Sequence, residues 1–154
     1  MLDSLNSASD SYASTADIAK LRQQLFVLEG NAGLALAACD MTLIASGTAT
    51  LEAALYKKPM VICYAMPKIS WWMMGNRGYL PWVGLPNILA NEWIVPELLQ
   101  DAATPHALAD AMLTLWHDDA QRAHIVAHFQ AMHASLQCDM PKRAAAAIAG
   151  LLSA

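Results

Sequence analysis

Three small residues, Ser46, Gly47 and Thr48, stand between an apolar run and a helix-like stretch, an arrangement that can bind an anion. A glycine lets backbone approach a ligand closely, and the first turn of a helix offers unpaired N–H groups and the positive end of the helix dipole. The hydroxyl groups of Ser46 and Thr48 add hydrogen-bonding capacity. The segment is therefore a candidate cradle for a diphosphate, and an ordinary serine cap at a helix start is the alternative.

Glu52 is the lone charged residue in the stretch TATLEAALY, and the usual local roles of a helical glutamate do not fit it. A capping box needs glutamate three residues after the cap, where this chain has Ala49 or Leu51. An ion pair needs a basic residue three or four positions later, where it has Leu55 and Tyr56. The carboxylate could instead accept hydrogen bonds from a ribose diol. An exposed glutamate that contributes nothing is the alternative.

These residues must be positioned by alternating strands and helices. Continuous apolar runs predict strands over 25–28, 41–45 and 60–64, with a fourth, edge strand over 82–85. Helices are expected over 16–25, 33–39, 48–56, 69–74, 96–100, 105–117, 120–136 and 141–152, and disorder over 1–13. This order predicts an α/β, Rossmann-like parallel sheet covered on both faces, with a helical C-terminal tail over 105–154.

Ligands of an open α/β sheet bind outside the carboxyl ends of its strands. The segment Ser46–Ala49 follows the second expected strand, and another segment begins at Tyr64, the last residue of the third. Both are therefore expected at the binding edge. Two amides, Asn87 and Gln100, can donate and accept hydrogen bonds, as sugar hydroxyls require. From the residues alone, Asn87 could equally be a loop residue capping its own turn, and the favoured interpretation of Gln100 is an ordinary helix-end residue.

The composition narrows the class of protein. The chain has 154 residues, of which 56% are hydrophobic and only 14% charged, so part of its surface is expected to meet a partner, a lipid or a missing domain. The net charge of −4 argues against nucleic-acid binding. Neither a signal peptide nor a membrane-spanning run is recognisable, which predicts a cytoplasmic protein.

The sequence predicts no disulfide framework and no metal site. The cysteines, Cys39, Cys63 and Cys138, are odd in number and far apart, and are expected to be reduced thiols. His124 and His128 have the i, i+4 spacing that can bind a metal, but no third ligand accompanies them in the sequence. We therefore expect neither metal nor cofactor.

Two long motifs, ASGTATLEAALYKKPMVICYAM and WVGLPNILANEWIVPELLQ, resemble the lipid-A-disaccharide synthases, and the similarity runs from about Phe26 to the C-terminus. The resemblance implies a two-domain (GT-B) fold and an inverting glycosyltransferase. The reaction implied transfers 2,3-diacylglucosamine from UDP to 2,3-diacylglucosamine 1-phosphate. It forms the β-1,6-linked lipid A disaccharide 1-phosphate and releases UDP.

The resemblance also implies roles for single residues. The backbone of Ser46–Ala49 would lie near the diphosphate, Glu52 would hold the ribose, and Asn87 and Gln100 would face the donor sugar and phosphates. This chain departs from the family pattern after the third expected strand, where it has Tyr64-Ala65 in place of Tyr-Arg. It also has Asn91-Glu92 where Gly-Arg is usual. Both departures remove a cation that could meet a phosphate.

By the same resemblance, residues 1–154 correspond to an incomplete C-terminal, UDP-sugar-binding domain. The N-terminal acceptor domain, which carries the general base, is absent, so no catalytic residue is expected in this chain and it should be inactive alone. Expected partners are UDP-2,3-diacylglucosamine, acylated glucosamine 1-phosphate, the missing domain or a second chain, and further copies of itself. An inner-membrane surface could be met through Trp71, Trp72, Met73 and Met74. A non-catalytic UDP-binding or interaction module, or a truncated remnant, is the alternative.

Overall fold

The computed structural model describes residues 15–67, 69–70 and 81–152. The chain divides into two units, residues 1–35 and residues 36–154. In the first unit, helix α1 spans Thr15–Gln24, one residue ahead of the predicted range 16–25 at both ends. The buried strand expected over residues 25–28 is wrong, because the segment has no regular structure and Phe26 is 87% exposed. An apolar run becomes a strand only where another strand accepts its backbone hydrogen bonds, and the described residues offer it none.

The second unit is built on a small parallel sheet. Strands β1 (Thr42–Ala45), β2 (Met60–Tyr64) and β3 (Glu97–Leu99) follow one another in the order β1-β2-β3. The register pairs Ala45 with Cys63 and Tyr64 with Leu99, so the three carboxyl ends lie at one edge. The predicted α/β class with a parallel sheet is confirmed. Strand β2 has the predicted bounds, and β1 begins one residue later than expected.

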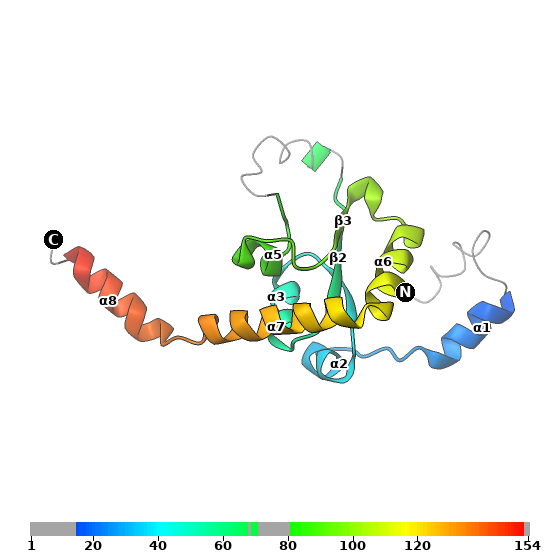
Figure 1. Ribbon diagram of the computed structural model, residues 1–154, viewed down its shortest axis with the longest axis horizontal. Coiled ribbons are helices and arrows are strands. Elements are labelled where there is room, and N and C mark those ends of the chain that lie inside the picture. The colour runs from blue at the N-terminus through cyan, green and yellow to red at the C-terminus, as the bar shows by residue number, and fades with distance from the viewer. Residues whose placement is uncertain (1–14, 68, 71–80, 153–154) are drawn as a thin grey trace. The chain divides into compact units, whose positions relative to one another are not determined.

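Helices cover both faces of this sheet. Helices α3 and α5 lie on one side and α6 on the other, and α7 contacts α3, α5 and α6 (Figure 1). Apart from α1, the described helices, in chain order, are α2 (Ala32–Ala38), α3 (Thr48–Leu55), α5 (Leu85–Ala90), the 3-10 turn η2 (Gln100–Ala102), α6 (Pro105–His117), α7 (Asp119–Leu136) and α8 (Met140–Leu152).

Side chains cap the first turns of two C-terminal helices: α6, which begins at the predicted residue, and α7, which begins one residue before it. The Thr104 hydroxyl accepts a hydrogen bond from the Ala107 N–H at 3.2 Å, just before α6. An Asp118 carboxylate oxygen accepts from the Gln121 N–H at 2.8 Å, before α7. Pro105 is the first residue of α6, where its missing N–H costs nothing.

Two further predicted elements, over 82–85 and 96–100, are wrong. The edge strand expected over 82–85 is absent, because Gly84 caps α5 and the helix starts at Leu85. The helix expected over 96–100 is instead strand β3 followed by η2. Proline suits the start of a helix and the entrance of an edge strand alike, so Pro96 could not decide between them. The apolar run after it was free to pair with β2, and that pairing decided the structure.

The core includes residues of the central strand and of α7. Met60, Val61 and Ile62 of β2 are fully buried, as are Ile125 and Phe129 of α7. All five belong to one apolar cluster. The central strand therefore anchors the edge of the sheet from which the candidate site is built.

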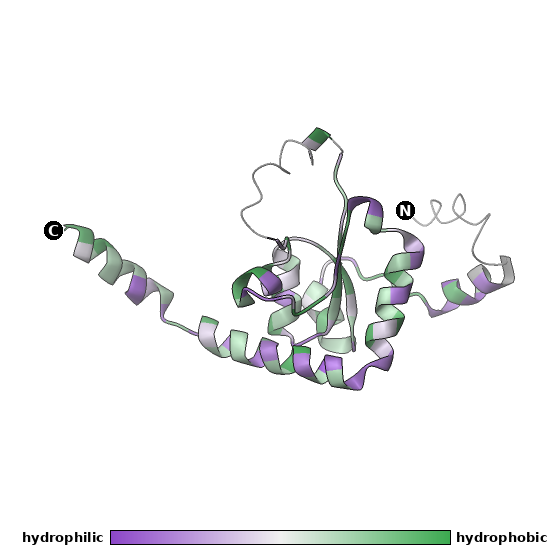
Figure 2. Cartoon of the chain, turned by 45° about the horizontal axis from the view of Figure 1, so that its top comes forward, coloured by the Kyte–Doolittle hydropathy of each residue, from purple (hydrophilic) through white to green (hydrophobic). Residues whose placement is uncertain are grey.

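Helix α8 contributes no buried residue to the core. Every described residue of α8 is exposed, although Ile148, Leu151 and Leu152 are apolar (Figure 2). None of the described helices is both long and apolar enough to cross a membrane. Ile69 and Ser70 are helical as predicted, while the stretch Trp71–Met74, expected to meet a membrane surface, lies outside the described residues.

Candidate functional site

The carboxyl edge of the sheet brings together three segments that the sequence singled out. Ser46 follows β1, Tyr64 ends β2 and Gln100 follows β3. Because Ala45 is in register with Cys63 and Tyr64 with Leu99, these three residues belong to one edge. Ligands of parallel α/β sheets bind at this edge.

The first turn of α3 presents its backbone to solvent. Gly47, at the N-cap, has φ 149° and ψ −167°, a conformation that strongly favours glycine. No side chain among the described residues caps this helix, and Gly47, Thr48 and Ala49 are exposed. A Cβ built on Gly47 would meet no atom within 4 Å, so the space in front of the turn is open. An uncapped helix start with accessible N–H groups can bind a phosphate.

Ser46 is tied to both neighbouring segments. Its Oγ donates a hydrogen bond to the Val83 carbonyl oxygen at 3.0 Å, and its N–H donates to the Cys63 carbonyl oxygen at 3.0 Å. The hydroxyl proton is thus engaged within the protein. What Ser46 can still offer a ligand is the lone pairs of its oxygen and the position that it gives to the turn.

Glu52 lies one turn beyond Thr48 on α3 and is exposed. Residues four apart on a helix share a face, so its carboxylate is on the same side as the Thr48 hydroxyl. This is the placement that the sequence predicts for a residue reaching past a diphosphate to a ribose.

Gln100 has an incomplete set of hydrogen bonds. Its Oε1 accepts from the Met66 N–H at 3.3 Å, which fixes the side chain against the segment after β2. Its Nε2 is buried and has no acceptor among the described residues. The backbone φ of 52° is also uncommon for a residue other than glycine or asparagine. A buried orphan donor on a strained backbone is a combination that collects at ligand sites.

Asn87 lies inside α5, whereas the sequence placed it in a loop. Its side chain is 0% exposed and its hydrogen bonds are complete. Nδ2 donates to the Val95 carbonyl oxygen at 2.9 Å and to Glu97 Oε1 at 2.8 Å, and Oδ1 accepts from the N–H groups of Ile94 and Val95 at 2.9 and 3.0 Å. A role as ligand of the donor sugar stays a prediction, and a bound sugar would have to replace one of these bonds.

Glu97 belongs to the same network, and the sequence analysis missed it. The residue is 9% exposed, and its carboxylate accepts hydrogen bonds from the Val83 and Gly84 N–H groups, both at 2.9 Å, as well as from Asn87. The available signal was a single charged residue within the apolar run IVPELL, the same argument that selected Glu52. The expected helix over 96–100 hid it, because a glutamate on a helix is usually solvated.

Gly84 completes the network by leaving room for the carboxylate. A Cβ at this position would collide with Ile62 Cδ1 and lie 2.8 Å from Glu97 Oε1. We expect Gly84→Ala to lower the free energy of unfolding by about 1–3 kcal/mol, the usual cost of overpacking a filled site. Urea denaturation measures this, with Gly150→Ala as control, because a Cβ on Gly150 meets nothing within 4 Å. Equal stability of Gly84→Ala and the wild type would contradict the crowding.

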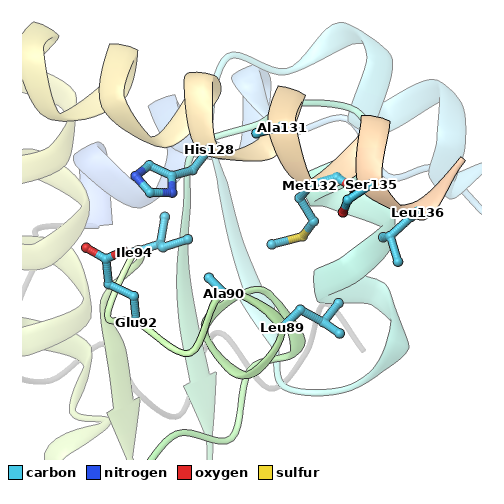
Figure 3. A pocket seen from close by; sticks show the side chains of 9 residues that line it. All are labelled: Leu89, Ala90, Glu92, Ile94, His128, Ala131, Met132, Ser135 and Leu136. Atoms are coloured by element: carbon cyan, nitrogen blue, oxygen red, sulfur yellow. The ribbon is translucent and has the colours of Figure 1, made fainter.

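A separate hollow of about 370 Å³ lies between α5 and α7 (Figure 3). Its floor is apolar, and Glu92 and His128 are its charged or titratable members. His128 Nε2 lies 3.2 Å from His124 Nε2, but no group of three potential metal ligands occurs among the described residues. None of the predicted site residues lines this hollow.

The three cysteines, Cys39, Cys63 and Cys138, are all free and partly buried.

Comparisons with known proteins point to one family. The family described as lipid-A-disaccharide synthetase matches residues 4–148. The chain is similar to the lipid-A-disaccharide synthases of Albidiferax ferrireducens (53% identity over 137 residues), Thiobacillus denitrificans (52% over 130) and Cupriavidus pinatubonensis (48% over 142). These alignments cover 86%, 84% and 89% of this chain but 35% of each relative. The chain therefore spans about a third of the length of the relatives that it matches.

Proposed function

Because the chain belongs to the lipid-A-disaccharide synthetase family, we propose that it forms the donor-nucleotide-binding part of a glycosyltransferase of lipid A synthesis. The donor is a UDP-linked 2,3-diacylglucosamine and the acceptor is 2,3-diacylglucosamine 1-phosphate. The products are the β-1,6-linked disaccharide 1-phosphate and UDP.

The residues at the carboxyl edge bind different parts of the donor. The N–H groups of the α3 turn, Gly47 to Ala49, take the diphosphate, and the Thr48 hydroxyl adds a further donor. Glu52 accepts hydrogen bonds from the ribose hydroxyls. Tyr64 and Gln100 contribute from the ends of β2 and β3, and Asn87 contributes from α5.

These assignments predict how the whole enzyme stabilises the departing diphosphate and where its general base lies. Negative charge grows on the diphosphate as the sugar departs, and the aligned N–H groups of α3 stabilise it more strongly in the transition state than in the ground state. Deprotonation of the acceptor hydroxyl needs a general base, which we assign to a part of the enzyme outside this chain.

The single observation that carries the proposal is the unsatisfied Nε2 of Gln100, at the same edge of the sheet as a helix start that no described side chain caps. Leaving a buried donor unpaired costs about 1–3 kcal/mol, so an acceptor on a ligand is the natural partner. A diphosphate or sugar oxygen at this edge would supply it.

The test is calorimetric titration of UDP and of uridine into the chain. We expect UDP to bind at least about tenfold more tightly than uridine, since only UDP meets the N–H groups of the α3 turn. Equal affinity would place the diphosphate elsewhere, and no binding of either would leave the chain without its proposed ligand.

The chain alone is expected to bind the donor without transferring the sugar, because the proposed base is not among its residues. Purified chain should give no disaccharide from UDP-diacylglucosamine and acceptor under conditions in which a full-length relative does. Fusing the preceding residues of such a relative to this chain should restore transfer. Turnover by the chain alone, at a rate near that of the relative, would refute the assignment of the base.

A further inference from the structure

Glu97 is a buried carboxylate whose described partners are neutral N–H groups. Val83 N and Gly84 N donate to it at 2.9 Å, and Asn87 Nδ2 donates at 2.8 Å. A carboxylate accepting three such bonds holds its donors in a fixed arrangement, because hydrogen bonds to a charged group are about twice as strong as neutral ones. The strongest local constraint on the segment Val83–Gly84 therefore comes from β3.

The same segment holds the proposed phosphate turn. The Val83 carbonyl oxygen accepts the hydrogen bond of Ser46 Oγ at 3.0 Å. One residue, Val83, is thus bound through its N–H to Glu97 and through its carbonyl group to Ser46. A continuous path of hydrogen bonds connects the first residue of β3 with the residue that opens the α3 turn.

We infer that Glu97 is a positioning residue of the donor site: it fixes Val83, and Val83 fixes Ser46 and the N–H groups that follow it. This inference rests on the proposed function in naming UDP as the ligand of that turn. The path itself is a property of the protein without ligand. Glu97 does not touch the donor, and its effect on binding passes through Ser46.

A purely structural role for Glu97 makes a different prediction. If the carboxylate only stabilises the start of α5, its replacement lowers stability, and the variant molecules that remain folded bind UDP normally. If it positions Ser46, the folded variant binds UDP more weakly. That loss shrinks once Ser46 has lost its hydroxyl.

The variant Glu97→Gln separates these roles. A glutamine of the same shape keeps most hydrogen bonds when its oxygen accepts from the Gly84 N–H and from Asn87 Nδ2. Its NH2 group then faces the Val83 N–H, so that bond of the path is lost. We expect UDP affinity to fall about tenfold in the folded variant. In a Ser46→Ala background the same change should cost less than about twofold, because coupled sites are not additive. Glu92→Gln, an exposed glutamate on the same connection, is the matched control and should bind UDP as the wild type does.

Amide hydrogen exchange tests the path without UDP. Glu97→Gln should accelerate exchange of the Ser46 N–H, and Ser46→Ala should accelerate exchange of the Val83 N–H. The exchange rate of the Val83 N–H in Ser46→Ala tests the path even if Glu97→Gln does not fold. Unchanged Val83 exchange in Ser46→Ala overturns the inference. So does wild-type UDP affinity in folded Glu97→Gln. If the wild type binds no UDP while both exchange effects appear, the proposed ligand is wrong and the positioning path stands.

Discussion

Replacing Asn87 by alanine is expected to lower the free energy of unfolding by about 3–5 kcal/mol. The substitution removes the partners of the Ile94 and Val95 N–H groups and of the Val95 carbonyl oxygen, and it takes one donor from the Glu97 carboxylate. Ile94 and Val95 are buried, so water cannot easily replace the lost partners. Thermal unfolding followed by circular dichroism should show a fall in Tm of about 10 °C or more.

Two further variants sharpen this test. Asn87→Asp keeps the size of the side chain but sets a second acceptor against Glu97 Oε1, so it should destabilise the protein at least as much as alanine does. Gln121→Ala removes an amide from an exposed position on α7 and should change Tm by no more than about 2 °C. If Asn87→Ala had the same Tm as the wild type, this network would contribute little to stability.

Replacing Glu52 by alanine is expected to weaken UDP binding by about 1.5–3 kcal/mol, or roughly 10- to 150-fold. The proposed ribose hydroxyls donate to this carboxylate, and the substitution removes both charge and acceptor. Glu52→Gln should lie between the wild type and Glu52→Ala, because its amide oxygen still accepts a hydrogen bond. Calorimetric titration of UDP gives the three affinities.

Stability distinguishes a binding role of Glu52 from a structural one. Its side chain is exposed, so Glu52→Ala should unfold within about 0.5 kcal/mol of the wild type. Glu29→Ala, which removes another exposed carboxylate, should alter neither stability nor UDP affinity. Equal affinity of Glu52→Ala and the wild type would remove Glu52 from the site.

The sequence predicted those parts of the fold whose signals are local. The run MVICY is a strand with the predicted bounds, and Thr104 and Asp118 cap helices that begin at the predicted residue and one residue before it, respectively. The predictions over 82–85 and 96–100 were wrong. Proline is compatible with the start of a helix and with the start of an edge strand. In the second segment, pairing with β2, which is distant in the sequence, determined the structure. Residues 25–28 show the converse, an apolar run for which the described residues provide no partner strand.

The candidate site was predictable to a similar extent. The Ser46–Ala49 turn and Gln100 were selected from residue chemistry and family resemblance, and the sheet register places them at one edge. The bonds that engage Ser46, Asn87 and Glu97 could not be predicted, because they join residues that come together only when β3 pairs with β2. Whether a polar side chain is free or already satisfied depends on such long-range contacts.

The two strand connections differ in length, and this difference bears on how the second unit assembles. The connection from β1 to β2, residues 46–59, contains little beyond helix α3, whereas that from β2 to β3 spans residues 65–96. Each doubling of a flexible loop adds about 0.6 kcal/mol of closure entropy, so pairing of β1 with β2 has the lower entropic barrier. The Ser46–Ala49 turn can therefore form early in folding. Gln100 joins the edge only when the slower crossover closes.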